Sequence, residues 1–269
     1  MKTNKLSKVF IGLVLAFVYI PILSMVVFSF NSSRSLTRWT GFSLMWYKEL
    51  FLDQDIRQVV MVTIVIAVIS TVISTIIGTL ASIALTKQRK VLRETILSLN
   101  NIPLLNPEIV TAVALFILFG AFSIARGYTT MLLAHIAFSV PYVIITVYPK
   151  VRSLDPSLTD AAYDLGATPI KALIKVVLPQ IKVAIFAGAA IAFTMSFDDF
   201  AISYFAVSGT SIQNISIYLY TLRKGFVPTI NALSTLIVLV IVVKVVYDLV
   251  KTKKQKFKEW EKWKKYLQF

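Results

Sequence analysis

The sequence predicts an all-α membrane protein with six transmembrane helices. Apolar residues make up 57% of the 269 residues, and the mean hydropathy is +0.76, whereas a soluble domain is about half apolar or less. The apolar residues come in runs of about 20, the length that a helix needs to cross a bilayer. The charged residues, 15% of the chain, lie between the runs. Composition and spacing together therefore exclude a soluble globular domain.

Each of the six apolar runs is expected to form one helix. The first follows three lysines and contains Pro21, where we expect a kink. A signal peptide begins in the same way, but this run is long enough to span, and no small-residue cleavage site follows it. Within one transmembrane domain covering residues 1–269, the expected spans are residues 9–30, 59–85, 95–122, 129–149, 183–207 and 231–250.

The distribution of basic residues predicts the orientation. Of the 28 lysines and arginines, 20 lie in the N-terminus, in residues 87–93, in residues 150–182 and in the tail at 251–269. Because short cytoplasmic segments carry an excess of Lys and Arg, both termini and the 150–182 loop are expected in the cytoplasm. The net charge of +15 follows from this bias, so it does not indicate a nucleic-acid partner.

Aromatic residues mark two segments outside the spans. Trp39, Trp46 and Tyr47 suit a segment that lies along the outer membrane interface, where amphipathic rings are enriched. The basic tail, 251–269, repeats aromatic residues at roughly helical spacing among eight lysines. We expect it either to lie on the anionic inner leaflet or to be a solvated topology signal.

The third span is irregular near its middle. Asn106-Pro107 interrupts it, and Glu108 follows. A broken helix in a bilayer is tolerated only beside protein or a watery cavity, and discontinuous helices often border a substrate path. Glu108 is therefore expected either to face such a path or to be stabilised by the dipole of a half-helix.

Two adjacent acids lie inside the expected fifth span. Asp198 and Asp199 would each cost about 2.5–3.5 kcal/mol at the centre of a membrane helix. Paired acids beside a pathway favour a cationic substrate, and the alternative is that groups on neighbouring helices satisfy both. Nearby aromatic rings offer cation–π contacts to an alkylammonium group. These rings are Phe197, Phe200, Tyr204 and Tyr142.

The sequence contains few groups that suit catalysis or metal binding. His135 is its one histidine and lies inside an apolar run, so we expect a buried hydrogen-bonding residue, with a proton relay as the alternative. There is no cysteine, which excludes thiolate chemistry, and one histidine cannot form a histidine metal cluster. The sequence also lacks G-x-x-x-x-G-K-[ST], the loop that cradles nucleotide phosphates. We therefore predict no catalytic, metal or cofactor site, and no enzymatic activity in this chain.

The 150–182 loop contains a patterned stretch from Asp160 to Pro179. Asp155-Pro156 and Thr168-Pro169 each place a capping side chain directly before a proline, which is a favoured start of a helix. Gly166 stands between them, where a left-handed residue would end the first helix. Two short helices bent around a glycine are therefore expected.

The same stretch resembles the cytoplasmic EAA loop of ABC importer permeases. The pattern is an acid, two alanines, three further residues, a glycine, nine residues and then an aliphatic pair followed by Leu-Pro. Aspartate stands where the family usually has glutamate, so an ion pair with a partner would lie closer to the backbone. The resemblance implies that the loop docks on an ATPase as a coupling helix. The expected coupling residues are Asp160, Ala161, Ala162, Asp164, Gly166, Leu178 and Pro179.

Further segments resemble the permeases of spermidine/putrescine ABC importers over nearly the whole chain. They are Tyr19-Ile20-Pro21-Ile22, Asn106-Pro107-Glu108 and Ser196-Phe197-Asp198-Asp199. The resemblance implies a multi-pass cell-membrane subunit that pairs with a second, related permease, two ATP-binding subunits and an extracytoplasmic polyamine-binding protein. ATP would then drive import by alternating access. The assignment of Asp198, Asp199 and Glu108 to the path extends the cation argument and is not part of the resemblance.

Two alternatives stay open. Another importer of the same superfamily, for sulfate, ferric iron or thiamine, would share the loop, although paired acids in the path disfavour an anion. An ATP-independent channel or carrier would not need the loop.

Overall fold

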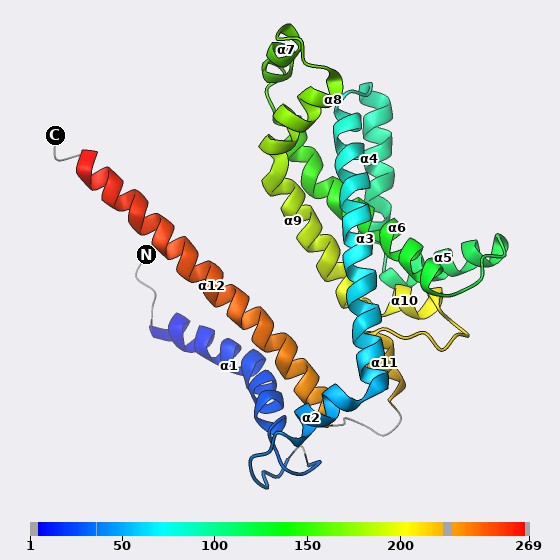
Figure 1. Cartoon of the computed structure of the whole chain (residues 1–269), viewed down its shortest axis with the longest axis vertical. Coiled ribbons are helices and arrows are strands. Elements are labelled where there is room, and N and C mark those ends of the chain that lie inside the picture. The colour runs from blue at the N-terminus through cyan, green and yellow to red at the C-terminus, as the bar shows by residue number, and fades with distance from the viewer. Residues whose placement is uncertain (1–4, 36, 223–227, 267–269) are drawn as a thin grey trace. The chain divides into compact units, whose positions relative to one another are not determined.

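The computed structural model describes residues 5–35, 37–222 and 228–266. These residues are helical apart from loops and one isolated bridge between Asn31 and Phe42. In chain order the helices are α1 (Lys5–Phe28), α2 (Met45–Leu52), α3 (Gln54–Thr86), α4 (Lys90–Leu105), α5 (Glu108–Ala121), α6 (Tyr128–Arg152), α7 (Ser157–Asp164), α8 (Pro169–Ala172), η1 (Leu173–Val177), α9 (Leu178–Phe197), α10 (Ala201–Ala206), α11 (Ile215–Thr221) and α12 (Pro228–Tyr266). The α-helices are labelled in Figure 1. The chain divides into two compact units, one of residues 1–57 with 222–269 and one of residues 58–221.

Several of the described helices have the length and composition of membrane spans. Five qualify, and the total becomes six if the bent pair α4–α5 is counted as one span. The single helices are Leu6–Phe28, Gln54–Thr86, Tyr128–Arg152, Pro169–Phe197 and Pro228–Tyr247. The all-α fold class with five or six candidate spans is thus confirmed.

In the first unit, α12 packs against α2 and α1, and one buried asparagine organises the loop after α1. The Asn31 side chain donates to the carbonyls of Ser35 and Arg38 (2.9 Å each) and accepts from Thr40. Trp46 donates from Nε1 to the Asn31 carbonyl (2.6 Å) and is 2% exposed. The indole of Trp46 thus closes this loop and is buried in it, and the placement of the segment along the membrane interface stays a prediction. Most side chains of the tail lie outside the described residues, so the predicted amphipathic face of the tail lies outside them as well.

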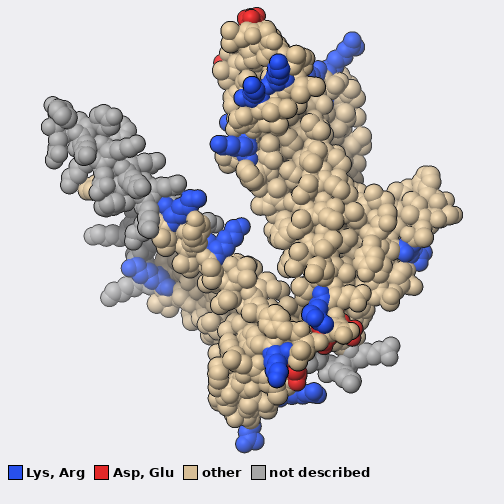
Figure 2. Space-filling model, in the orientation of Figure 1, with Lys and Arg blue, Asp and Glu red and all other residues tan. Residues whose placement is uncertain are grey.

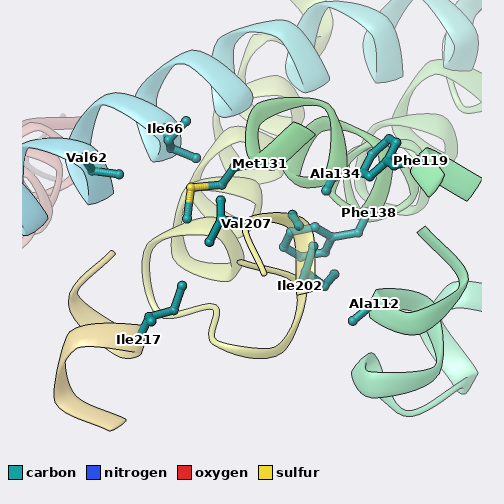
Figure 3. Packing of buried hydrophobic residues seen from close by; sticks show 11 residues of the cluster. Val62, Ile66, Ala112, Phe119, Met131, Ala134, Phe138, Ile202, Val207 and Ile217 are labelled. Carbon is teal, nitrogen blue, oxygen red and sulfur yellow. The ribbon is translucent and has the colours of Figure 1, made fainter. Parts of the chain in front are cut away.

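The second unit has a core that gathers helices from distant parts of the chain. Figure 3 shows Val62 and Ile66 of α3 facing Met131 of α6, with Ile202 of α10 and Ile217 of α11 beneath them in the view. This packing holds the short helix α10 among α3, α5, α6 and α11.

Close approach of α3 to α6 depends on glycine. A Cβ placed on Gly78 would lie 2.6 Å from Cγ1 of Val143, closer than real Cβ contacts. A Cβ placed on Gly188 of α9 would lie 3.4 Å from the same Cγ1 atom. Small residues let helix backbones approach in a membrane, where van der Waals packing drives association. Val143 is 0% exposed as a result.

The helix expected at 183–207 differs from the helix observed. It begins at Pro169, passes through the π-turn η1 and ends at Phe197. Pro179 has no N–H to donate to the carbonyl four residues before it. Directly before it, the Leu178 N–H donates to the carbonyl of Leu173, five residues back, which is the hydrogen bond of a π-turn. The predicted short second helix of the loop, α8, therefore continues through η1 into α9, and this helix ends at Phe197 rather than continuing to residue 207.

The start and end of α7 follow the expected capping signals. Ser157 donates its backbone N–H to Oδ1 of Asp155 (3.0 Å). This bond, with a second from the Ser157 side chain, lowers the pKa of the exposed Asp155 carboxyl. Gly166 follows α7 with φ +77°, the left-handed conformation expected of it. Thr168 accepts from the Lys171 N–H at the start of α8 (3.4 Å).

Candidate functional site

Two helices break at the polar positions of the sequence. α4 ends at Leu105 and α5 begins at Glu108, with a bend of 108° between them. Asn106 is extended (φ −85°, ψ 147°) because a following proline disfavours the helical conformation. On the other segment, α9 ends at Phe197 and α10 begins at Ala201. Since α5 packs against α10, the two breaks belong to the same part of the second unit.

The carboxylate of Asp199 is turned into the protein. Asp199 is 5% exposed, and its Oδ1 accepts from the N–H of Ile202 (3.2 Å). Its Oδ2 accepts from both the N–H and the hydroxyl of Ser203 (2.7 Å each). These donors belong to the first turn of α10, so Asp199 satisfies them as an N-cap residue does. The surroundings of Asp199 thus correspond to the alternative in which protein groups satisfy the acid.

His135 of α6 contacts residues on both sides of the same break. It is 1% exposed, with Nδ1 at 2.6 Å from Ser196 Oγ and Nε2 at 2.8 Å from Ser203 Oγ. Nε2 is also 3.5 Å from Oδ2 of Asp199. Ser196 Oγ lies 3.0 Å from Ser70 Oγ on α3, which extends the polar contacts to a further helix. The prediction of a buried hydrogen-bonding histidine is confirmed.

Asn214, which no sequence argument singled out, holds α11 to the break. Its Nδ2 donates to the backbone carbonyl of Asp199 (2.8 Å) and to Ser203 Oγ (2.9 Å), and its Oδ1 accepts from the N–H of Ile217 (2.9 Å). Ser216 donates to the carbonyl of Asp198 (3.2 Å). An asparagine directly before an apolar helix is an N-cap signal, and that pattern was readable in the sequence.

Asp198 and Glu108 differ from Asp199 in their exposure. Both are exposed, although the sequence predicts the same role for Asp198 and Asp199. The Glu108 carboxylate lies close enough to Asp198 and Asp199 to interact with them electrostatically. Among the described residues, neither Asp198 nor Glu108 forms an ion pair with a lysine or arginine. Among the residues that the structure describes, no basic side chain therefore neutralises the repulsion between these carboxylates.

Aromatic rings gather beside the break between α9 and α10. Phe200 lies 5.5 Å from Tyr204 and 4.8 Å from Tyr220, measured between ring centroids, and the two tyrosine rings are 6.0 Å apart. Tyr220 is 69% exposed and Tyr204 39% exposed. Tyr220, on α11, was missed because it lies outside the run that holds the acids. The three rings therefore form a cluster that is open to a ligand.

The other two predicted aromatic residues have different neighbours. Phe197 stacks on Phe193, with ring centroids 5.6 Å apart. Tyr142 of α6 is half-buried and lies within electrostatic reach of Glu108. Only Tyr142 thus joins a predicted acid, while Phe197 packs along its own helix.

The predicted coupling residues of α7 lie on an exposed end of the second unit. α7 carries Asp160, Ala161, Ala162 and Asp164 and has no buried residue. Apolar side chains around it are uncovered, with Leu165 89% and Ile170 68% exposed. Figure 2 shows basic side chains around the end that bears α7, whereas the helix sides in view are almost free of charge. Among the basic residues of this region are Lys150, Arg152, Lys171 and Lys175.

The described residues contain no group of three or more His, Cys, Asp or Glu side chains arranged to hold a metal ion. The carboxylates at the two breaks are therefore considered for their charge alone.

Comparison with known proteins gives a consistent result. Residues 74–256 match the family described as "Binding-protein-dependent transport system inner membrane component". The chain is 35% identical over 233 residues to the spermidine/putrescine transport system permease protein PotC of Haemophilus influenzae, covering 86% of this chain and 90% of that protein.

Two solved structures share the fold. One is a bacterial ABC transporter that imports the acidic polysaccharide alginate (TM-score 0.65, 15% identity, 88% of this chain and 90% of that one). The other is a bacterial alginate ABC transporter in complex with an alginate pentasaccharide-bound periplasmic protein (TM-score 0.62, 14% identity, 89% and 91%). At these identities the likeness concerns the fold and not the cargo.

Proposed function

The chain belongs to the family of binding-protein-dependent transport system inner membrane components, and we propose that it is a permease subunit of an ATP-driven importer of polyamines. It forms half of the translocation path, and its cargo is a spermidine- or putrescine-like cation. The similar protein of Haemophilus influenzae is named for transport of the same compounds.

One observation carries the choice of cargo. Glu108 and Asp198 are exposed, lie within electrostatic reach of each other, and have no ion pair with a described lysine or arginine. Two carboxylates that interact in this way repel each other. A bound polyammonium ion would turn the repulsion into attraction. Anions would add to the repulsion, which argues against sulfate.

The aromatic cluster supports the same class of cargo. A cation over an aromatic face is stabilised by about 0.5–2 kcal/mol, more when both groups are shielded from water. Phe200, Tyr204 and Tyr220 offer three ring faces beside the break that carries Asp198. A flexible alkylammonium chain can contact a carboxylate and a ring at once. This combination suits polyamines better than ferric iron, which prefers oxygen ligands in a compact group.

Asp199 has a different role in this proposal. Three hydrogen bonds from Ile202 and Ser203 already occupy its carboxylate. We therefore assign it to holding α10 in place, and we keep Asp198 and Glu108 as the acids that meet the substrate, with Tyr142 beside Glu108. Phe197 is assigned to packing because its ring stacks on Phe193.

The energy source is proposed to be a separate ATPase. The exposed apolar residues Leu165 and Ile170, beside the acids and alanines of α7, suit docking in a groove of another protein. Because η1 and α9 continue from α8 without a loop, a movement of the docked loop would be transmitted directly to α9 and the break at its end. The basic residues around this end support a cytoplasmic position for it and for both termini.

The remaining partners follow from the family. We propose a second, related permease that completes the path, two ATP-binding subunits, and an extracytoplasmic protein that delivers the polyamine. The periplasmic protein bound to the alginate transporter supports the last of these.

Substrate competition in vesicles containing the complete importer tests the proposal. Uptake of labelled spermidine should require ATP and the binding protein, and excess putrescine should reduce it, while thiamine, ferric citrate and sulfate should not. Saturable uptake of one of the three competitors in place of spermidine would overturn the polyamine assignment. Uptake that persists without ATP would instead indicate a channel or a carrier.

A further inference from the structure

We propose that His135 is a positioning residue, whose imidazole carries its proton on Nε2 and ties α10 to α6 across the break so that Asp198 is held in a fixed direction. The inference rests on the proposed function only where it assigns Asp198 to the substrate. The hydrogen-bond arrangement around the ring carries the rest.

The proton position follows from counting donors at Ser203. Its hydroxyl has one proton, which is donated to Oδ2 of Asp199 (2.7 Å). The same oxygen accepts from Nδ2 of Asn214 (2.9 Å). The contact of 2.8 Å between Ser203 Oγ and Nε2 of His135 therefore needs its proton from the imidazole. The hydroxyl then makes three hydrogen bonds, the full number that it can make.

The second ring nitrogen reaches the other side of the break. Nδ1 lies 2.6 Å from the hydroxyl of Ser196, in the last turn of α9, while Ser203 lies in α10. Asp198 is between these two serines in the chain. One rigid ring thus spans the segment that presents the acid, and the plane of the imidazole fixes the spacing of its two partners.

The contact to Ser203 is the more consequential of the two. α6 and α9 pack along each other, so α9 stays in place without the contact to Ser196. α10 has six residues, too few for a helix that is stable by itself. Its place depends on the core residues around Ile202 and on the polar contacts made by Ser203. Removing the Nε2 contact should therefore release α10 and, with it, the direction of Asp198.

Amide side chains separate the two contacts experimentally. Glutamine in place of histidine puts an amide nitrogen near the position of Nε2, and asparagine puts an amide group near Nδ1. His135→Gln should therefore keep the contact to Ser203, whereas His135→Asn and His135→Ala should lose it. A role in bulk packing would instead make alanine and both amides differ only by volume.

Distance measurement across the break tests the positioning role. The chain has no cysteine, so nitroxide labels can be attached at V183C on α9 and S211C after α10, both exposed positions, in the assembled importer with cysteine-free partners. The label-to-label distance distribution, measured by double electron–electron resonance, should broaden in His135→Ala and His135→Asn and stay as in the parent for His135→Gln. Spermidine uptake at limiting substrate should fall about tenfold in the first two, the factor for one buried group left unpaired, and about twofold or less in the third.

The outcomes separate this inference from the proposed function. An unchanged distance distribution in His135→Ala overturns the positioning role, whatever the uptake. A broadened distribution with unchanged uptake supports the positioning role and removes Asp198 from the path. Because the chain has one histidine, ¹⁵N-histidine labelling of the full chain in lipid vesicles gives the signal of His135 alone. A protonated Nε2 is expected, and a ring protonated only on Nδ1 would contradict the hydrogen-bond count.

Discussion

The adjacent acids Asp198 and Asp199 should respond oppositely to the same substitution. Asp199 is 5% exposed and accepts hydrogen bonds from Ile202 and Ser203. Asn at this position keeps one acceptor oxygen and turns an NH₂ group toward protein donors. A hydrogen bond to a charged group contributes about 1.5–3 kcal/mol, so Asp199→Asn should destabilise the fold by about 3 kcal/mol. That is a large share of the roughly 5–15 kcal/mol by which a native domain is stable.

Asp198→Asn should leave stability within about 0.5 kcal/mol, because the side chain is exposed and carries no such bonds. It should instead raise the spermidine concentration for half-maximal uptake by about tenfold, the factor for a loss of about 1.4 kcal/mol of binding. Glu108→Gln changes the other exposed acid of the proposed site and should have the same two effects as Asp198→Asn. The assay combines uptake in vesicles, corrected for the amount of chain, with the fraction that stays monodisperse in detergent after heating. Equal loss of stability at Asp198 and Asp199 would refute the distinction.

Three further predictions concern packing, coupling and the aromatic cluster. Gly78→Ala should destabilise the chain by about 1–3 kcal/mol, since its Cβ would lie 2.6 Å from Cγ1 of Val143, and Val143→Ala should restore the heat resistance in detergent. Gly120→Ala is the control and should be neutral, because an added Cβ there has nothing within 4 Å. Equal effects of the two glycine changes would argue against a close crossing of α3 and α6. Gly166→Ala strains a residue at φ +77° by about 1–2 kcal/mol. It should lower ATP-driven uptake per copy of the chain while spermidine binding persists. Normal uptake would show that the loop has no coupling role. Tyr220→Ala should raise the half-saturating spermidine concentration about tenfold and Tyr220→Phe should not, and equal uptake by both variants would exclude cation–π contact there.

The local signals in the sequence predicted much of the architecture. Asn106-Pro107 marked the break between α4 and α5 because proline acts on its own helix and on the residue before it. Gly166 marked the end of α7 for an equally local reason. Such features depend on neighbours in sequence, so they can be read without tertiary structure.

The errors came from features that depend on residues far apart in sequence. An apolar run from 183 to 207 gave no sign that α9 ends at Phe197, because Asp199 starts a new helix with Ser203 and is held there by Asn214. Hydropathy does not distinguish a continuous helix from two helices that are both buried. Similarly, the burial of Trp46 depends on the carbonyl of Asn31 and could not be read from the residue type alone.

The division of the acids into two roles also needed the structure. Asp198 and Asp199 are equivalent in composition and position, and only their contacts show that one carboxylate is occupied and the other exposed. Tyr220 was invisible for the same reason, since its ring meets Phe200 only after α11 folds back on the break.

Asp198 and Glu108 are proposed to form a cation site in an ATP-driven path. The most direct measurement is initial spermidine uptake by vesicles containing the complete importer, with the parent chain and with Asp198→Asn and Glu108→Gln combined, with and without ATP. ATP-dependent uptake is expected for the parent. At limiting spermidine, the double variant should lose more than the tenfold expected of either single variant, without reaching the product of the two factors, because interacting sites are not additive. Undiminished ATP-dependent uptake by a double variant present at the same amount in the membrane would contradict the proposed cation site.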